Sequence, residues 1–324
     1  MRKYIAFLFI ITSVIFVIII FKSLGVSKSY HSQKVGVILF SEEFRESFIG
    51  FQEGAKFYGL KNMEFIVENV NGDLGKIETI LKYFKEREVK IVYATTTPVN
   101  LKIKELNKKY DFFVIFNQVA DPKGSGLVKD ESCSGTNFIG VSRAAFMTFG
   151  KRMEIFKDVF PEMQNILIFY KENEKFLEEH LKEYDSLAKK INIKTLLVPI
   201  EDGRSIENYQ IKDKNTGIFM APSAYSVKYI KNIKSLADRY RIPIMAIDGN
   251  LVEKGATIAY SQSFYNDGFS AAYYLHLLLK GIDPKILPTQ KPQKMELWIN
   301  KKNIKNINMK FNQVYYGYAD RVIE

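Results

Sequence analysis

The stretch VGVILF at residues 35–40 decides the fold, because a short apolar run of this kind is typical of a buried β-strand. The segment that follows, residues 43–58, places Phe44, Phe48 and Phe51 at helical spacing. A strand followed by a helix is the repeating unit of a parallel sheet covered by helices.

The same unit recurs along the chain. Further strands are predicted at residues 64–70, 89–94, 112–116, 166–170, 195–198, 217–220, 244–247 and 257–261, with helices at 74–84, 99–108, 144–159, 175–190, 224–240 and 267–280. No linker rich in Gly, Ser or Pro separates the two halves of this series. The sequence therefore predicts an α/β fold with two lobes, and a ligand cleft at the carboxyl ends of their parallel strands.

An apolar run at residues 4–21 precedes this body, flanked by Arg2, Lys3 and Lys22. This charge pattern is typical of a segment that engages the secretion machinery. Cleavage after Gly25 and retention as an uncleaved anchor both stay open, since about 18 apolar residues nearly span a bilayer. Residues 1–28 are therefore predicted to be a signal peptide or membrane anchor, and the body is expected to be periplasmic or otherwise extracytoplasmic.

Net charge and cysteine content exclude several classes of protein. The formal net charge is +11, but the lysines of the body alternate with glutamates on predicted helix faces, and no basic patch interleaves with stacking aromatics. Nucleic acid is therefore not an expected partner, although a basic body suits an anionic membrane surface. Cys133 is the only cysteine, which excludes an intramolecular disulfide, and it is either an incidental loop thiol or a reactive one.

The motifs of common enzymes are missing. The chain has no phosphate-binding loop, zinc-protease motif or nucleophile elbow, and the first strand is not followed by a dinucleotide-binding glycine fingerprint. Its three histidines, His31, His180 and His276, are scattered. No catalytic residue, metal or cofactor is predicted.

The turn Thr95-Thr96-Thr97-Pro98 lies where strand 89–94 gives way to a helix. Hydroxyl groups and free amides at a helix N-terminus favour an anion, so a ligand carboxylate is a natural guest. The alternative is that one threonine merely caps the helix.

Other polar groups also follow predicted strands. Ser41 follows the first strand, Asn117 and Asp121 follow strand 112–116, and Asp248 follows strand 244–247. A carboxylate at such a position can accept an ammonium group, while turn chemistry before Pro122 or Gly249 is the alternative.

Five aromatic residues lie near the same strand ends and could enclose an apolar part of a ligand, unless they belong to the core; they are Phe40, Phe44, Tyr225, Phe264 and Tyr265.

The chain resembles the ABC transporter substrate-binding proteins of the tryptophan/tyrosine-binding type, which have the type I periplasmic binding protein fold. The resemblance rests on residues 94–98 (ATTTP), 114–122 (VIFNQVADP) with 126–128 (GLV), 137–142 (NFIGVS), 242–256, 265–281, 283–288 and 296–300 (ELWIN). It covers residues 34–310.

The resemblance implies two Rossmann-like lobes joined by three crossovers near Ser142, Ser263 and Gln290. Lobe 1 would be residues 34–142 completed by 264–290, and lobe 2 residues 143–263 completed by 291–324. The family's threonine turn and acidic strand end, which hold the charged groups of the ligand, correspond to Thr95, Thr96, Thr97 and Asp248, with Asp121 as a further candidate.

The chain departs from the family at residues 221–224, where an aspartate-asparagine pair is common and Ser223 is the only polar side chain. Ser223, with Tyr225 and Tyr265, completes the predicted ligand-binding set.

The function that the resemblance implies is reversible capture of a small solute, such as an amino acid, for an ABC permease in the membrane. Binding rather than turnover is expected. The alternative is a membrane-anchored sensing module that uses the same cleft to signal to a separate partner protein.

Overall fold

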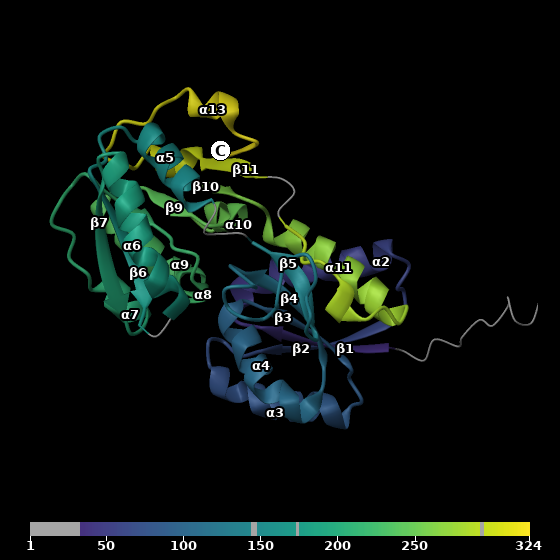
Figure 1. Cartoon of the computed structure of the whole chain (residues 1–324). Helices are drawn as coiled ribbons and strands as arrows, with labels where there is room; N and C mark the ends of the chain where they lie inside the picture. Colours follow the sequence, from purple (N-terminus) through teal and green to yellow (C-terminus); the bar gives the residue numbers. More distant parts are fainter. Residues whose placement is uncertain (1–32, 144–147, 173–174, 292–294) are drawn as a thin grey trace, which may run out of the picture.

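The computed structural model describes residues 33–143, 148–172, 175–291 and 295–324, which form two α/β lobes, each built around one sheet (Figure 1). The predicted leader, residues 1–28, lies outside the described residues. Within those described ranges, no helix is both long and apolar enough to cross a membrane.

The first sheet has the strand order β2-β1-β3-β4-β5, and all its strand pairs are parallel. Its strands are β1 (Gln33–Leu39), β2 (Met63–Asn69), β3 (Ile91–Thr95), β4 (Phe113–Val119) and β5 (Phe138–Ser142). The helices between them are α2 (Arg45–Phe57), α3 (Ile77–Glu86) and α4 (Thr97–Tyr110), with 3-10 turns at Glu42–Phe44 and Leu74–Lys76.

Strand β1 is apolar and buried from Val35 to Leu39, because both faces of its sheet are covered there. Val35, Val37 and Leu39 belong to the apolar cluster that includes α2 and α11 (Phe264–Leu279), whereas Ile38 belongs to the cluster that includes Phe84 of α3. Side chains alternate between the two faces of a strand, so the run at residues 35–40 supplies both clusters.

Helix α11 comes from late in the chain and returns to the first lobe, where it packs closely against α2 (Figure 1). Glycines permit the close approach: a Cβ at Gly268 would collide with the backbone carbonyl of Ser47, and one at Gly50 would collide with that of Tyr265. The two helices therefore meet backbone to backbone.

The second sheet has the order β12-β11-β10-β9-β8-β6-β7. Its strands are β6 (Asn165–Lys171), β7 (Lys194–Ile200), β8 (Thr216–Phe219), β9 (Ile244–Ala246), β10 (Ile258–Ser261), β11 (Glu296–Asn300) and β12 (Arg321–Ile323). Its helices are α5 (Phe149–Val159), α6 (Lys175–Lys190), α7 (Gly203–Glu207), α8 (Ala224–Lys228), α9 (Ile230–Tyr240), α10 (Gly249–Glu253), α12 (Lys301–Ile304) and α13 (Tyr315–Tyr318), and a 3-10 turn at Pro284–Ile286 precedes β11.

The predicted two-lobed α/β architecture is confirmed, but strands β5 and β12 were not among the predicted strands, and two further elements differ. Strand β11 pairs with β10 in the antiparallel direction, so the second sheet is mixed rather than purely parallel. The helix predicted at 224–240 is interrupted at Tyr229 and forms two helices, α8 and α9.

Three segments connect the lobes. Strand β5 of the first sheet leads into the second lobe, β10 leads back to α11, and the segment after α11 leads to β11. The first and third of these segments lie side by side, since Ser142 N donates to Gln290 O at 2.9 Å and Val141 forms a β-bridge with Gln290.

Candidate functional site

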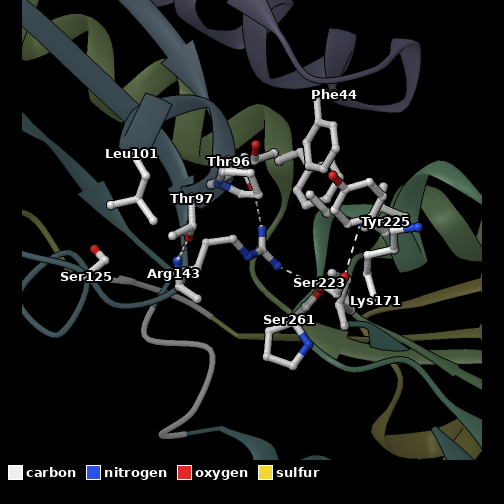
Figure 2. Close-up of a pocket in the computed structure, with 18 of the residues that line it drawn as sticks. Phe44, Thr96, Thr97, Leu101, Ser125, Arg143, Lys171, Ser223, Tyr225 and Ser261 are labelled. Atoms are coloured by element: carbon white, nitrogen blue, oxygen red, sulfur yellow. Dashed lines mark hydrogen bonds between the residues drawn. The ribbon is translucent and has the colours of Figure 1, made fainter. Parts of the chain in front are cut away.

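A cavity of about 710 Å³ lies between the lobes, where the carboxyl ends of strands from both sheets converge. The first lobe contributes Thr96 after β3 and Gln118 at the end of β4, and the second contributes Ser223 after β8 and Ser261 at the end of β10. This volume falls in the range of sites for small organic molecules. In Figure 2, Thr97 and Leu101 face Ser223 and Tyr225 across the pocket.

Only part of the predicted threonine turn lies on the cavity wall. Thr95 is fully buried, and its Oγ1 accepts from Phe40 N at 3.0 Å, which ties β3 to the end of β1. Thr96 and Thr97 line the cavity, and Pro98 follows in the first turn of α4. Two of the three threonines of the predicted turn therefore lie on the cavity wall.

Thr96 has an unusual backbone, with φ 72° and ψ 153°. This region is essentially restricted to glycine, and a residue held there costs about 1–3 kcal/mol. Its Oγ1 is buried and has no hydrogen-bond partner in the described structure, although its backbone N donates to Asn117 O at 2.8 Å. A strained residue with an unused hydroxyl at a cavity wall is typical of a binding site.

Aromatic rings from both lobes form one wall. Phe44 and Phe264 stack with centroids 5.2 Å apart, and Tyr225 meets Phe40 edge to face at 5.1 Å. Phe44, Tyr225 and Phe264 line the cavity, while Phe40 is fully buried behind them. The pocket is therefore suited to an apolar or aromatic group.

Arg143 joins the two lobes at the cavity. Its Nη1 donates to Gln118 Oε1 and to Asp267 Oδ2, both at 3.0 Å, and its Nη2 donates to the backbone oxygen of Ile247 at 2.7 Å. Asp248 Oδ2 lies 3.6 Å from Nη1. The side chain of Arg143 is only 9% exposed and lies over the ring of Phe264. Because Arg143 follows β5 directly, this cluster lies next to a segment that connects the lobes.

The two carboxyl groups beside Arg143 are also buried. Burial raises the pKa of Asp248 to about 7 and that of Asp267 to about 6, and in both cases Arg143 opposes the increase. One guanidinium thus faces two carboxylates, and desolvation favours a proton on the cluster. Asp248 also caps α10 by accepting from Asn250 N at 2.9 Å, and it accepts from Phe264 N at 2.9 Å.

Arg152, on α5, is a second buried guanidinium on the cavity wall. Its Nη2 donates to the backbone oxygens of Met220 at 2.9 Å and Ala246 at 3.1 Å, and its guanidinium lies over the ring of Phe219. Burial is the main cause that lowers the pKa of Arg152 to about 9; Tyr184 opposes this decrease and the neighbouring Arg143 adds to it. Its Nε has no hydrogen-bond partner in the described structure.

Of the ten predicted ligand-binding residues, four line the cavity: Thr96, Thr97, Ser223 and Tyr225. The other six are absent from its wall: Ser41, Thr95, Asn117, Asp121, Asp248 and Tyr265.

Those six have other surroundings. Asp121 accepts from Gly124 N at 2.7 Å in a turn, as the turn alternative predicts, and the hydroxyl of Tyr265 donates to Glu53. Asn117 Oδ1 accepts from Gln118 N at 2.7 Å, Ser41 is buried, and Asp248 belongs to the Arg143 cluster.

Arg143 and Arg152 were not among the predicted site residues. Arg143 directly follows β5, which was not among the predicted strands; had that strand been predicted, the strand-end criterion that selected Asp248 would also have selected Arg143. Arg152 lies inside a helix, where nothing in the sequence separates it from a surface arginine. No group of three or more His, Cys, Asp or Glu side chains able to hold a metal occurs among the described residues.

The chain is similar in sequence and fold to known proteins. The chain is 22% identical over 270 residues to a tyrosine-binding protein of Clostridioides difficile (strain R20291), covering 83% of this chain and 77% of that protein. The structure of the ABC domain in complex with L-Trp from Streptococcus pneumonia is similar with a TM-score of 0.80 and 20% identity, covering 90% of this chain and 100% of that one. The ligand-free, open structure of a substrate binding protein with adhesive properties from Clostridium difficile has a TM-score of 0.63 and 20% identity, covering 90% and 99%.

The family model for ABC transporter substrate binding proteins matches residues 34–323, which is nearly the whole body. Proteins of this family bind small solutes and are not enzymes, which confirms the prediction of binding rather than turnover. The chain belongs to the ABC transporter substrate binding protein family.

Proposed function

We propose that this chain is the extracytoplasmic solute-binding component of an ABC importer, and that its ligand is an aromatic amino acid or a close relative. The observation that carries the proposal is the cavity between the lobes, where the aromatic wall of Phe44, Tyr225 and Phe264 lies beside buried polar groups from both sheets. The relatives named for tyrosine and L-Trp support the same ligand class.

In this proposal the ring of the ligand packs against the aromatic wall, and Thr96, Thr97 and Ser223 supply polar contacts. Burial of one aromatic side chain removes about 150–250 Å² from water, worth about 4–6 kcal/mol before the costs of association. An aliphatic amino acid of smaller area would bind more weakly at the same site.

We infer that the lobes comprise residues 34–142 with 264–290 and residues 143–263 with 291–324. Hinge closure about the three connecting segments would bring the walls together around the solute, and the closed form would dock on a membrane permease. Residues 4–21 would direct the chain out of the cytoplasm, as a signal peptide or as an anchor.

Isothermal titration of the purified full-length chain, held in a mild detergent, tests the ligand class. Tyrosine, tryptophan and phenylalanine are expected to bind, and leucine, glutamate and a pentose are expected to bind much more weakly or not at all. Absence of binding by all three aromatic amino acids would refute the proposal.

A further inference from the structure

Arg152 differs from the other buried cation of the pocket in lacking a carboxylate partner among the described residues. Arg143 lies within 3.6 Å of two carboxylates, Asp248 and Asp267. Arg152 is 2% exposed, and its hydrogen bonds among the described residues go only to backbone carbonyl groups. A buried cation without an anion is unfavourable, and an anion bound beside it removes part of that cost.

Unused hydrogen-bond donors lie on the same cavity wall. Arg152 Nε and Ser261 Oγ come from the second lobe, and Thr96 Oγ1 comes from the first. All three are buried and have no hydrogen-bond partner in the described structure. Gln262 Nε2 on the same wall is a fourth such donor. Buried donors are nearly always satisfied in native proteins, so this group on one cavity indicates a ligand that accepts hydrogen bonds.

The acidic groups near the cavity are placed differently. Asp248 and Asp267 contact Arg143 and are absent from the cavity wall. The carboxylates that do line it, Glu105 and Glu172, are exposed to solvent. The buried part of the wall therefore presents a cation and donors, without a buried carboxylate among the described residues that line it.

Resting on the proposed function, we propose that Arg152 holds the carboxylate of the ligand, and that this carboxylate, rather than the ammonium group, determines which solutes bind. Ser261 and Thr96 supply further hydrogen bonds to the same ligand from opposite lobes. The site then takes aromatic carboxylic acids as a class, of which the amino acids are members, and excludes the corresponding amines.

A series of three ligands on the unaltered full-length chain separates the two charges. Tyrosine carries both, 3-(4-hydroxyphenyl)propionate lacks the ammonium group, and tyramine lacks the carboxylate. Isothermal titration is expected to place the propionate within about tenfold of tyrosine and tyramine about 100-fold weaker, since losing a charge-assisted bond at a desolvated cation removes about two factors of ten in affinity.

Variants at Arg152 and Lys171 show which residue causes the weaker binding of tyramine. Arg152→Gln is expected to reduce the ratio of tyrosine to tyramine affinity from about 100 to below about 10, while Arg152→Lys keeps the charge and retains a ratio of more than about 10. Lys171→Gln is the matched comparison, because Lys171 is a cation on the cavity wall whose Nζ donates to Glu201 O at 2.6 Å. Circular dichroism of each variant checks folding.

The outcomes are distinct. If no aromatic ligand binds the unaltered chain, the proposed function fails and the inference fails with it. If tyrosine binds and tyramine binds equally well, the proposed function survives and the carboxylate inference is overturned, whatever the variants do. If tyramine is excluded but Lys171→Gln, and not Arg152→Gln, removes the exclusion, the carboxylate lies at the rim and the role of Arg152 is wrong.

Discussion

Replacing Arg143 with methionine tests the cluster that joins the lobes. The substitution keeps much of the side-chain volume but leaves Asp248 and Asp267, whose side chains are 0% and 5% exposed, without their cation. Breaking a buried ion pair from one side costs about 3–5 kcal/mol. We expect the free energy of unfolding to fall by that amount at about pH 8, where the carboxyl groups of the unfolded chain are ionised.

The sign of the pH dependence follows from the pKa values. Burial raises the pKa of Asp248 to about 7 and of Asp267 to about 6, so the folded chain binds more protons than the unfolded chain from about pH 4 up to those values. These two groups therefore stabilise the fold more as the pH falls, and their contribution is lost as the pH rises through 6 to 7.

Without Arg143 both pKa values are expected to rise further, because the charge of Arg143 is the largest of the influences that lower them. The variant can then recover stability by binding protons at a pH where the unaltered chain has released them. Two pH units for one carboxyl group are worth about 3 kcal/mol, so most of the loss seen at about pH 8 is expected to disappear at about pH 5.5.

Urea unfolding at both pH values measures this difference. Arg239→Met serves as the control, because Arg239 is exposed and donates only to the backbone oxygen of Glu207, at 2.8 Å, so a change below about 0.5 kcal/mol at either pH is expected. An Arg143→Met loss that is equal at both pH values would refute the buried-cluster reasoning, and would point to lost packing instead.

Three other substitutions test the pocket and the fold. Tyr225→Ala is expected to weaken tyrosine binding about tenfold and Tyr225→Phe much less, because an aromatic contact is worth about 0.5–1.5 kcal/mol beyond area burial; calorimetry that ranks the two equally would contradict the aromatic wall. Thr96→Gly should stabilise the ligand-free chain by about 1 kcal/mol in thermal melting, by releasing the strained backbone, and should weaken the ligand; a destabilised variant would argue against the strain. Gly268→Ala should cost more than about 3 kcal/mol because its Cβ collides with the backbone of Ser47, whereas Gly317→Ala meets nothing and should change the melting temperature little.

The strands and the edge of the sheet that holds the site were predictable from local pattern. The apolar runs at residues 35–40 and 166–170 specify strands covered on both faces, and polar residues after strands accumulate where parallel strands end. The antiparallel direction of β11 was not predictable, since direction depends on how the chain returns from α11 rather than on ELWIN itself. The break at Tyr229 has neither proline nor glycine to indicate it.

The strand-end rule selects positions but cannot say which of them face the ligand. Asp248 and Ser223 both follow strands of the second sheet, yet only Ser223 lines the cavity. The difference arises from Arg143, a residue far away in the sequence, which lies between Asp248 and the pocket. A partner more than a hundred residues distant leaves no local signal, so the orientation of Asp248 could not be predicted.

The two buried arginines beside the pocket, Arg143 and Arg152, have different surroundings. Buried charges between two lobes are favourable only when they are paired, and the Arg143 cluster pairs its charges with groups from both lobes. A binding site needs the opposite, a buried group left unpaired until the solute arrives, and Arg152 has that character. Both arginines are buried beside the pocket, and they differ in whether a carboxylate lies next to the guanidinium group. The proposed ligand contact of this pocket therefore rests on an unpaired buried charge rather than on polarity alone.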